Sequence, residues 1–330
     1  MNIRVRAVCF CSGVVCLSCL PAASAQTPAT ANYPARTVRM VVGFAPGGGT
    51  DVIARFFSQK LGESLGQTFI VENRAGAGGN IGAEYVAKAA PDGYTLMIAI
   101  ASLAINVTLY KQLGYDPVKD FTPIGTVAIT PNCFVVHPSL PVKSLRELIA
   151  LARAKPGEIS YASAGAGTPV HLSVELFQLM AHIKLLHVPY NGSGPSTAAV
   201  LGGQVPMLAT TLPAALPHVR AGKLKMLGIT SAERTPLAPE YPTVAEAAGL
   251  PGYEAGVWYG LVAPAGMPPA IVNKLNAENE KLLQQREVRE RLAALGFDPY
   301  RHTQVEFGEM IKSDIVKWGR VVRESGARAD

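Results

Sequence analysis

The chain has 330 residues, of which 48% are hydrophobic and 16% are charged, and its formal net charge is +6 at pH 7. This length suffices for two lobes of ordinary domain size. The positive charges are spread along the chain, without a basic run or interleaved basic and aromatic residues, so the sequence gives no sign of a nucleic-acid site.

The first 25 residues have the layout of a secretory signal peptide. Arg4 and Arg6 precede an apolar run over residues 7–20, and small residues surround the expected cleavage point after Ala25. An apolar run of about 14 residues is shorter than the roughly 20 that span a membrane, which argues against an anchor. We therefore expect an exported, periplasmic protein.

Removal of this leader changes the charge and the cysteine content. The leader contains two arginines and no acidic residue, so the mature chain carries a charge of +4. Four of the five cysteines are also removed, and Cys133 remains in an apolar run. We expect it to be a small buried side chain, and an internal disulfide is excluded.

Short strands rich in β-branched residues alternate with helical stretches, a pattern typical of α/β proteins with largely parallel sheets. Helices are expected between the strands, and four are marked by apolar stripes, a capping box or an opening proline pair. These helices cover residues 51–65, 144–154, 268–285 and 305–324. The predicted strands cover residues 38–44, 68–72, 96–100, 134–137, 159–162, 186–189, 206–209, 224–230 and 257–263.

Two segments are predicted to cross between lobes, residues 121–136 and residues 253–264. Both are rich in strand-forming residues, and the first is interrupted by Pro123 and Pro131. If both are hinges, lobe I consists of residues 26–125 and 258–330, and lobe II is an insertion of residues 126–257. A hinge with two crossings allows the lobes to close around a ligand.

Three glycine-rich loops each follow a predicted strand and precede a helix. They are loop one (residues 45–51, APGGGTD), loop two (residues 75–80, AGAGGN) and loop three (residues 163–169, SAGAGTP). Glycine lets the backbone approach a ligand, and the free amides at a helix N-terminus favour an anion. Thr50, Asp51, Asn80 and Thr168 are good N-cap residues. Loops from both lobes would together clamp a carboxylate, although such glycines also occur in simple tight turns.

Signatures of enzymes are weak. No loop fits a phosphate-binding or dinucleotide-binding fingerprint, and no Gly-x-Ser-x-Gly elbow is present, so no cofactor is expected. His171 and Glu175 share a helix face, but no further ligand is spaced to complete a metal site. The charged residues 286–291 are interpreted as a solvated helix face.

The chain resembles the solute-binding proteins of tripartite tricarboxylate transporters, also called the Bug family, over essentially the whole mature sequence. Eight segments in order carry the resemblance: residues 33–34 (YP), 44–51 (FAPGGGTD), 71–82 (VENRAGAGGNIG), 90–96 (APDGYTL), 115–121 (YDPVKDF), 188–192 (VPYNG), 221–224 (AGKL) and 258–266 (WYGLVAPAG).

The resemblance implies a periplasmic two-lobe binding protein of type II, a Venus flytrap in which each lobe is a central β-sheet flanked by helices. It implies a small carboxylate ligand, delivery to the membrane subunits of a tripartite tricarboxylate transporter, and we expect a monomer. The ligand-binding residues that it implies are Pro46, Gly47, Gly48, Asp51, Ser102, Ser163, Gly165, Gly167, Thr168, His171, Tyr190 and Thr210.

Two departures from the family pattern bear on the ligand. Leu103 stands where the family tends to have histidine, and Ala209-Thr210 replaces a frequent Phe-Asp pair. Because the missing acid would be the natural partner of an ammonium group, we expect a carboxylate without a charged amine. Two other functions remain open: a ligand-loaded sensor for a membrane histidine kinase, and an α/β enzyme.

Overall fold

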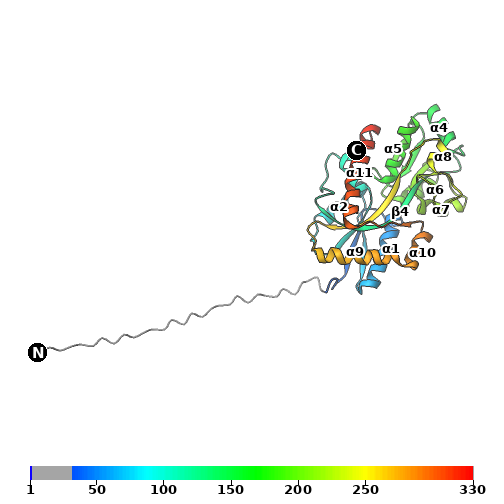
Figure 1. Cartoon of the computed structure of the whole chain (residues 1–330). Coiled ribbons are helices and arrows are strands. Elements are labelled where there is room, and N and C mark those ends of the chain that lie inside the picture. The colour runs from blue at the N-terminus through cyan, green and yellow to red at the C-terminus, as the bar shows by residue number, and fades with distance from the viewer. Residues whose placement is uncertain (2–31, 330) are drawn as a thin grey trace.

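The structure is a computed structural model that describes Met1 and residues 32–329. The predicted leader lies, apart from Met1, outside the described residues. Two mixed β-sheets share one long strand, and helices cover their faces (Figure 1). No helix in the described part of the chain is both long enough and apolar enough to cross a membrane.

The first sheet has the strand order β2-β1-β3-β9-β4, and β10 pairs with the far side of β4. β1, β2 and β3 are parallel, and β9 runs antiparallel to β3 and β4. Its strands are β1 (Val38–Val42), β2 (Phe69–Asn73), β3 (Thr95–Ala99), β4 (Phe121–Val136), β9 (Gly256–Pro264) and β10 (Asp298–Pro299). The elements around it are α1 (Gly49–Leu65), η1 (Ala77–Gly79), α2 (Asn80–Ala87), α3 (Ser102–Leu109), α9 (Pro269–Gln284), α10 (Arg286–Ala294) and α11 (Gln304–Ser325).

The second sheet is formed by β6, β5, β7, the last part of β4, and β8. β5 is parallel to β6 and β7, whereas β4 is antiparallel to β7 and β8. The further strands are β5 (Ser160–Ser163), β6 (Leu186–Pro189), β7 (Met207–Thr211) and β8 (Lys225–Ile229). The helices are α4 (Leu145–Ala154), α5 (Pro169–Ala181), α6 (Ser193–Leu201), α7 (Leu212–Arg220) and α8 (Val244–Ala248). We call the first sheet with its helices lobe I and the second lobe II.

The chain passes between the sheets in both segments that the sequence singled out. β4 pairs with β9 as far as Pro131 and with β7 and β8 from Asn132 onward. On the return, Ala255 donates its amide to Thr230, and β9 starts at the next residue. The lobe boundaries at residues 126 and 257 stay a prediction.

The first crossing is more regular than the sequence indicated. Its two prolines were expected to interrupt it, but Pro123 and Pro131 both lie within the 16-residue strand β4. The register of β4 against β9 shifts between Pro123 and Gly125 and again between Thr126 and Ala128. Irregularities of this kind are where a sheet tolerates a residue without an amide hydrogen.

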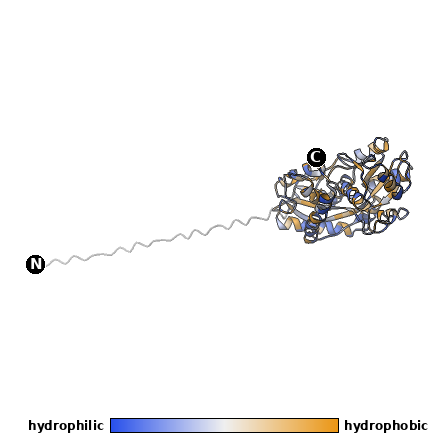
Figure 2. Cartoon of the chain, turned by 90° about the horizontal axis from the view of Figure 1, so that it is seen from above, coloured by the Kyte–Doolittle hydropathy of each residue, from blue (hydrophilic) through white to orange (hydrophobic). Residues whose placement is uncertain are grey.

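Apolar side chains from both faces of the sheets form the core. Phe57 and Leu61 of α1 are buried as their helical spacing predicted, and so are Ile311 and Trp318 of α11. Cys133 is a free, fully buried thiol, as expected. The helices carry hydrophilic residues beside these hydrophobic ones (Figure 2).

Candidate functional site

A cavity lies between the two lobes. Its volume of about 30 Å³ has room for about two water molecules. It is lined from lobe I by Phe44, Gly48, Gly49, Thr50, Ile100, Val257 and Tyr259, and from lobe II by Ala164, Thr168, Pro169, Val170, Ser193 and Thr211.

Four helices begin at this cavity. α1 starts at Gly49, α5 is capped by Thr168, α6 starts at Ser193 and α7 starts at Leu212, directly after Thr211. The first amides of a helix have no acceptor within the helix, and the helix dipole adds partial positive charge there. With one helix from lobe I and three from lobe II, the cavity suits an anion.

Loop one presents backbone amides to the cavity. The first hydrogen bond of α1 runs from Val52 N to Gly48 O at 3.0 Å, so the preceding amides of Gly49 and Thr50 have no helical acceptor. Gly48 is the N-cap and offers no side-chain cap. Thr50 and Asp51 were predicted as caps, but both lie inside the helix, and Asn80 likewise lies inside α2 after its cap Gly79.

Asp51 holds loop one together and does not line the cavity. Its carboxylate accepts hydrogen bonds from Gly47 N at 3.1 Å, Arg55 Nε at 2.9 Å and Asn73 Nδ2 at 2.9 Å. Burial alone would raise the pKa of this carboxyl, but the hydrogen bonds from Arg55, Asn73 and Gly47 together hold it below its ordinary value. A carboxylate occupied in this way orients the loop.

Loop three uses most of its amides internally. Gly165 N donates to Ser163 Oγ at 3.1 Å, and Gly167 N donates to His171 Nδ1 at 3.3 Å. Thr168 caps α5 as predicted, its hydroxyl accepting from His171 N at 3.3 Å. These amides therefore have partners within lobe II. Val170, which follows loop three in the first turn of α5, lines the cavity, and its amide has no helical acceptor.

The walls of the cavity combine apolar side chains with residues that bear hydroxyl groups, among them Thr211 and Tyr259. Phe44, Ile100 and Val257 make it largely apolar, and no charged side chain lines it. A methyl group on Gly49 would lie 2.8 Å from the Tyr259 hydroxyl and 3.2 Å from Thr211 Oγ1, so both oxygens face the start of α1. Thr211 Oγ1 is buried without a hydrogen-bond partner. Such an oxygen can donate its proton to an anion in the cavity.

Other residues that the family resemblance implied lie near the cavity without lining it. Ser102 lines an adjoining cavity of about 10 Å³, which shares Phe44 and Ile100 with the main one, and its hydroxyl has no partner. Thr210, on β7, is buried and its hydroxyl is also unpartnered. Pro46, Gly47, Ser163, Gly165, Gly167, His171 and Tyr190 lie in the loops or directly beneath them.

Among the lining residues that the sequence reasoning missed are three that bear hydroxyl groups and lie outside the three glycine-rich loops, Ser193, Thr211 and Tyr259. Ser193 stands in Asn191-Gly192-Ser193-Gly194, and glycines and a serine of this kind are typical of a helix start. Tyr259 and Thr211 carry no local signal, because long-range strand pairing brings them to α1.

Among the residues that the structure describes, no group of three or more histidine, cysteine or acidic side chains could hold a metal ion. His171 and Glu175 do face each other, with Nε2 3.6 Å from Oε1, but both are engaged in a buried network of hydrogen bonds.

Comparison with known proteins agrees with this geometry. A family model described as the tripartite tricarboxylate transporter family receptor matches residues 53–327. An R. palustris protein with adipate is 38% identical at a TM-score of 0.87, over 90% of this chain and 99% of that one. The periplasmic binding protein BugD is 33% identical with a TM-score of 0.85, over 90% of this chain and 99% of that one. MatC from Rhodopseudomonas palustris, with bound malate, is 37% identical with a TM-score of 0.83, over 88% of this chain and 100% of that one.

The extent of these matches confirms the predicted family and fold class. The chain belongs to the receptor family of the tripartite tricarboxylate transporters, the Bug family of solute-binding proteins.

Proposed function

We propose that this protein captures a small carboxylate between its lobes in the periplasm and delivers it to the membrane subunits of a tripartite tricarboxylate transporter. The observation that carries the proposal is the meeting of four helix N-termini at one cavity. Their amides would hold the carboxylate oxygens, and Thr211 would donate a further hydrogen bond. Relatives with adipate and with malate support the ligand class.

The lining indicates what kind of carboxylate fits. With no acidic side chain at the cavity, an ammonium group on the ligand would be buried without a partner, which is costly. Phe44, Ile100 and Val257 favour an apolar body. A carboxylate without a charged amine meets both conditions.

Ligand entry requires the lobes to separate. A cavity with room for about two water molecules is smaller than a dicarboxylate of six carbons. The two crossings, at Pro131–Asn132 and at Ala255–Gly256, are the places where the lobes would rotate apart. A ligand can favour closure only by binding the closed form more tightly than the open one.

The proposed action is binding, with no bond made or broken. Ser163 Oγ and His187 Nε2 lie 2.6 Å apart, a buried serine–histidine pair that the sequence did not reveal. Ser163 is fully buried and its oxygen also accepts the amide of Gly165. A nucleophile must reach its substrate, and this hydroxyl has no access to the cavity.

The test is a thermal-shift screen over small carboxylates, including adipate, malate and ordinary α-amino acids, on unfolded and refolded protein. Binding raises the apparent stability by mass action. We expect carboxylates without an amine to raise the Tm. We also expect Gly49→Ala to weaken binding by about tenfold or more, because its methyl group would meet Tyr259 and Thr211 inside the cavity.

Gly202→Ala is the matched control. Gly202 has φ −80°, and a methyl group there would meet its nearest atom at 3.4 Å, so this variant should bind like the wild type. A screen without a single stabilising carboxylate would refute the proposed function. Wild-type affinity in Gly49→Ala would remove the start of α1 from the site.

A further inference from the structure

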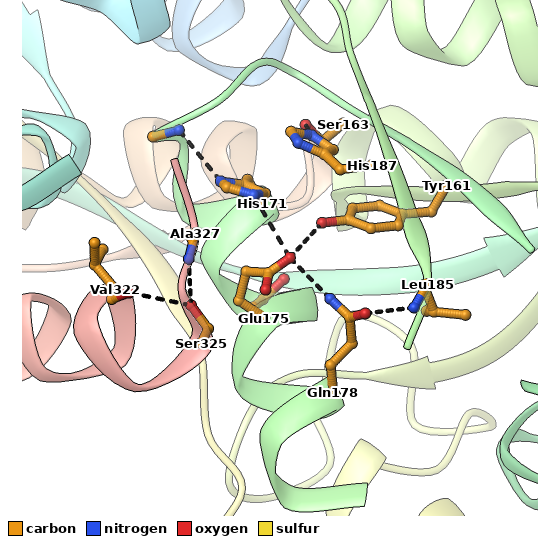
Figure 3. A network of polar contacts seen from close by, with 12 residues as sticks. Tyr161, Ser163, His171, Glu175, Gln178, Leu185, His187, Val322, Ser325 and Ala327 are labelled. Carbon is orange, nitrogen blue, oxygen red and sulfur yellow. Dashed lines mark hydrogen bonds and ion pairs between the residues drawn. The ribbon is translucent and has the colours of Figure 1, made fainter. Parts of the chain in front are cut away.

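Beneath loop three lies a buried polar network that does not touch the cavity (Figure 3). His171 and Glu175 project from one face of α5 toward Tyr161 on β5 and His187 on β6. The imidazoles of His171 and His187 are stacked, with ring centres 4.0 Å apart and planes 12° apart. His187 also stacks on Tyr161 at 4.9 Å.

The hydrogen bonds fix the protonation of His171. Its Nδ1 accepts the amide of Gly167, so this nitrogen must carry a lone pair. The ring proton therefore resides on Nε2, which faces Glu175 Oε1 at 3.6 Å. Glu175 Oε1 is itself held by the hydroxyl of Tyr161 at 2.9 Å and by Gln178 Nε2 at 2.8 Å.

A second branch of the network holds the other glycine of the loop. Ser163 Oγ accepts the amide of Gly165 and lies 2.6 Å from His187 Nε2. Gly165 and Gly167 have φ values of +130° and +75°, a region that glycine adopts readily and other residues rarely. Each of the two glycine amides is thus held by one arm of the histidine network.

We propose that His171 is a positioning residue: its neutral imidazole holds the Gly167 amide, which sets the backbone of loop three and the start of α5 in the shape that receives the carboxylate. His187, through Ser163, does the same for Gly165. The consequence for ligand binding rests on the proposed function, whereas the hydrogen bond itself exists without a ligand.

The electrostatic surroundings keep both imidazoles neutral. Burial, followed by the neighbouring His187, holds the pKa of His171 well below its ordinary value, and burial lowers the pKa of His187 to about 4. Burial also raises the pKa of Glu175, the acid nearest to His171. The other titratable groups close by are Tyr161, and His182 and Lys184 at the mouth of a surface groove that reaches Glu175.

Protonation of His171 at Nδ1 would place two N–H donors, that of the imidazole and that of Gly167, opposite each other. A proton on Nδ1 would point at the Gly167 N–H, and the hydrogen bond would be lost. Loop three should therefore keep its shape throughout the neutral range and lose it only in acid well below the ordinary titration of histidine.

The experiment compares two substitutions by NMR on the ligand-free protein. His171→Asn retains an acceptor near the position of Nδ1, whereas His171→Leu removes it. We expect the Gly167 amide to be protected from exchange in the wild type and in His171→Asn, and to lose its protection and downfield shift in His171→Leu. His218→Gln, on α7 outside the network, serves as the matched control and should resemble the wild type.

The same variants are then titrated with adipate and malate. We expect His171→Leu to weaken binding about tenfold and His171→Asn to stay within about threefold of the wild type. If His171 had only a structural role, both variants would lose the same amount of affinity. An unchanged Gly167 amide in His171→Leu, or titration of His171 between pH 6 and 7, would overturn the proposal. A wild type that binds neither acid but shows the expected amide behaviour would refute only the proposed function for these ligands.

Discussion

At the scale of single residues, Asp51 holds loop one in place although its side chain does not line the cavity. Its place beside three glycines and a threonine suggested a ligand contact, but its carboxylate is occupied by Gly47, Arg55 and Asn73. Only the three-dimensional position of Asn73, 22 residues away at the end of β2, reveals this role.

Replacing Asp51 with alanine should lower the free energy of unfolding by about 2 kcal/mol, since three donors lose a buried acceptor. Urea denaturation at pH 7 measures the change. Because the pKa of Asp51 is lowered in the folded protein, its contribution is complete at neutral pH. The difference from the wild type should shrink as the pH falls below about 4.

Glu290→Ala is the control for this measurement. Glu290 pairs with Arg286 on α10, but both side chains are exposed, at 62% and 90%. Exposed pairs of this kind contribute less than about 1 kcal/mol. Equal losses of stability in the two variants would contradict the role assigned to Asp51.

At the scale of elements, the sequence located helices and strands well where packing and capping act locally. The last helix was predicted over residues 305–324 and is observed at Gln304–Ser325. The helix predicted to begin at Asp51 starts two residues earlier, because Gly49 and Thr50 already adopt the first helical turn after Gly48, without a side-chain cap. Which amides of a loop stay free depends on partners such as His171, which local patterns do not reveal.

The N-terminus of α11 carries a complete capping box. Thr303 Oγ1 accepts from Glu306 N at 3.3 Å, and Glu306 Oε2 accepts from Thr303 N at 2.8 Å. α11 packs against α3 of lobe I and α5 of lobe II, so the stability of its N-terminus affects the packing of both lobes. Thr303→Ala should lower the free energy of unfolding by about 1 kcal/mol, as measured by urea denaturation.

Thr303→Ser tests whether the cap is responsible. It keeps the hydroxyl acceptor and removes only a methyl group, so its stability should match that of the wild type. If the serine variant lost as much as the alanine variant, packing of the methyl group, and not the cap, would explain the loss.

At the scale of the whole molecule, the sequence yielded the family and the α/β class, because these follow from ordered motifs and from the alternation of elements. The residues that line the cavity could not be predicted from the sequence in the same way. Gly49 meets Tyr259 and Thr211 across distances of more than 150 residues in the chain, and those contacts depend on how the two sheets share β4.

The two lobes touch through glycines. Across the interface, Ala45 N of lobe I donates to Asn191 O of lobe II at 3.1 Å. Within lobe I, Asn106 Nδ2 donates to Gly78 O at 3.3 Å, beside loop three. A methyl group on Gly78 would lie 2.3 Å from the carbonyl oxygen of Ala166. Absence of a side chain at Gly78 is therefore a condition for this close approach of the lobes.

Gly78→Ala should hold the lobes apart and weaken the binding of adipate or malate about tenfold, as measured by calorimetry, and should enlarge the ligand-saturated protein in small-angle scattering. Gly78 has φ +63°, so alanine also adds backbone strain of about 1 kcal/mol. Gly222→Ala controls for this strain, because Gly222 has φ +70° and open space around it. Both variants should lose similar stability, while only Gly78→Ala loses affinity. Equal affinity in the two would mean that this contact does not govern closure.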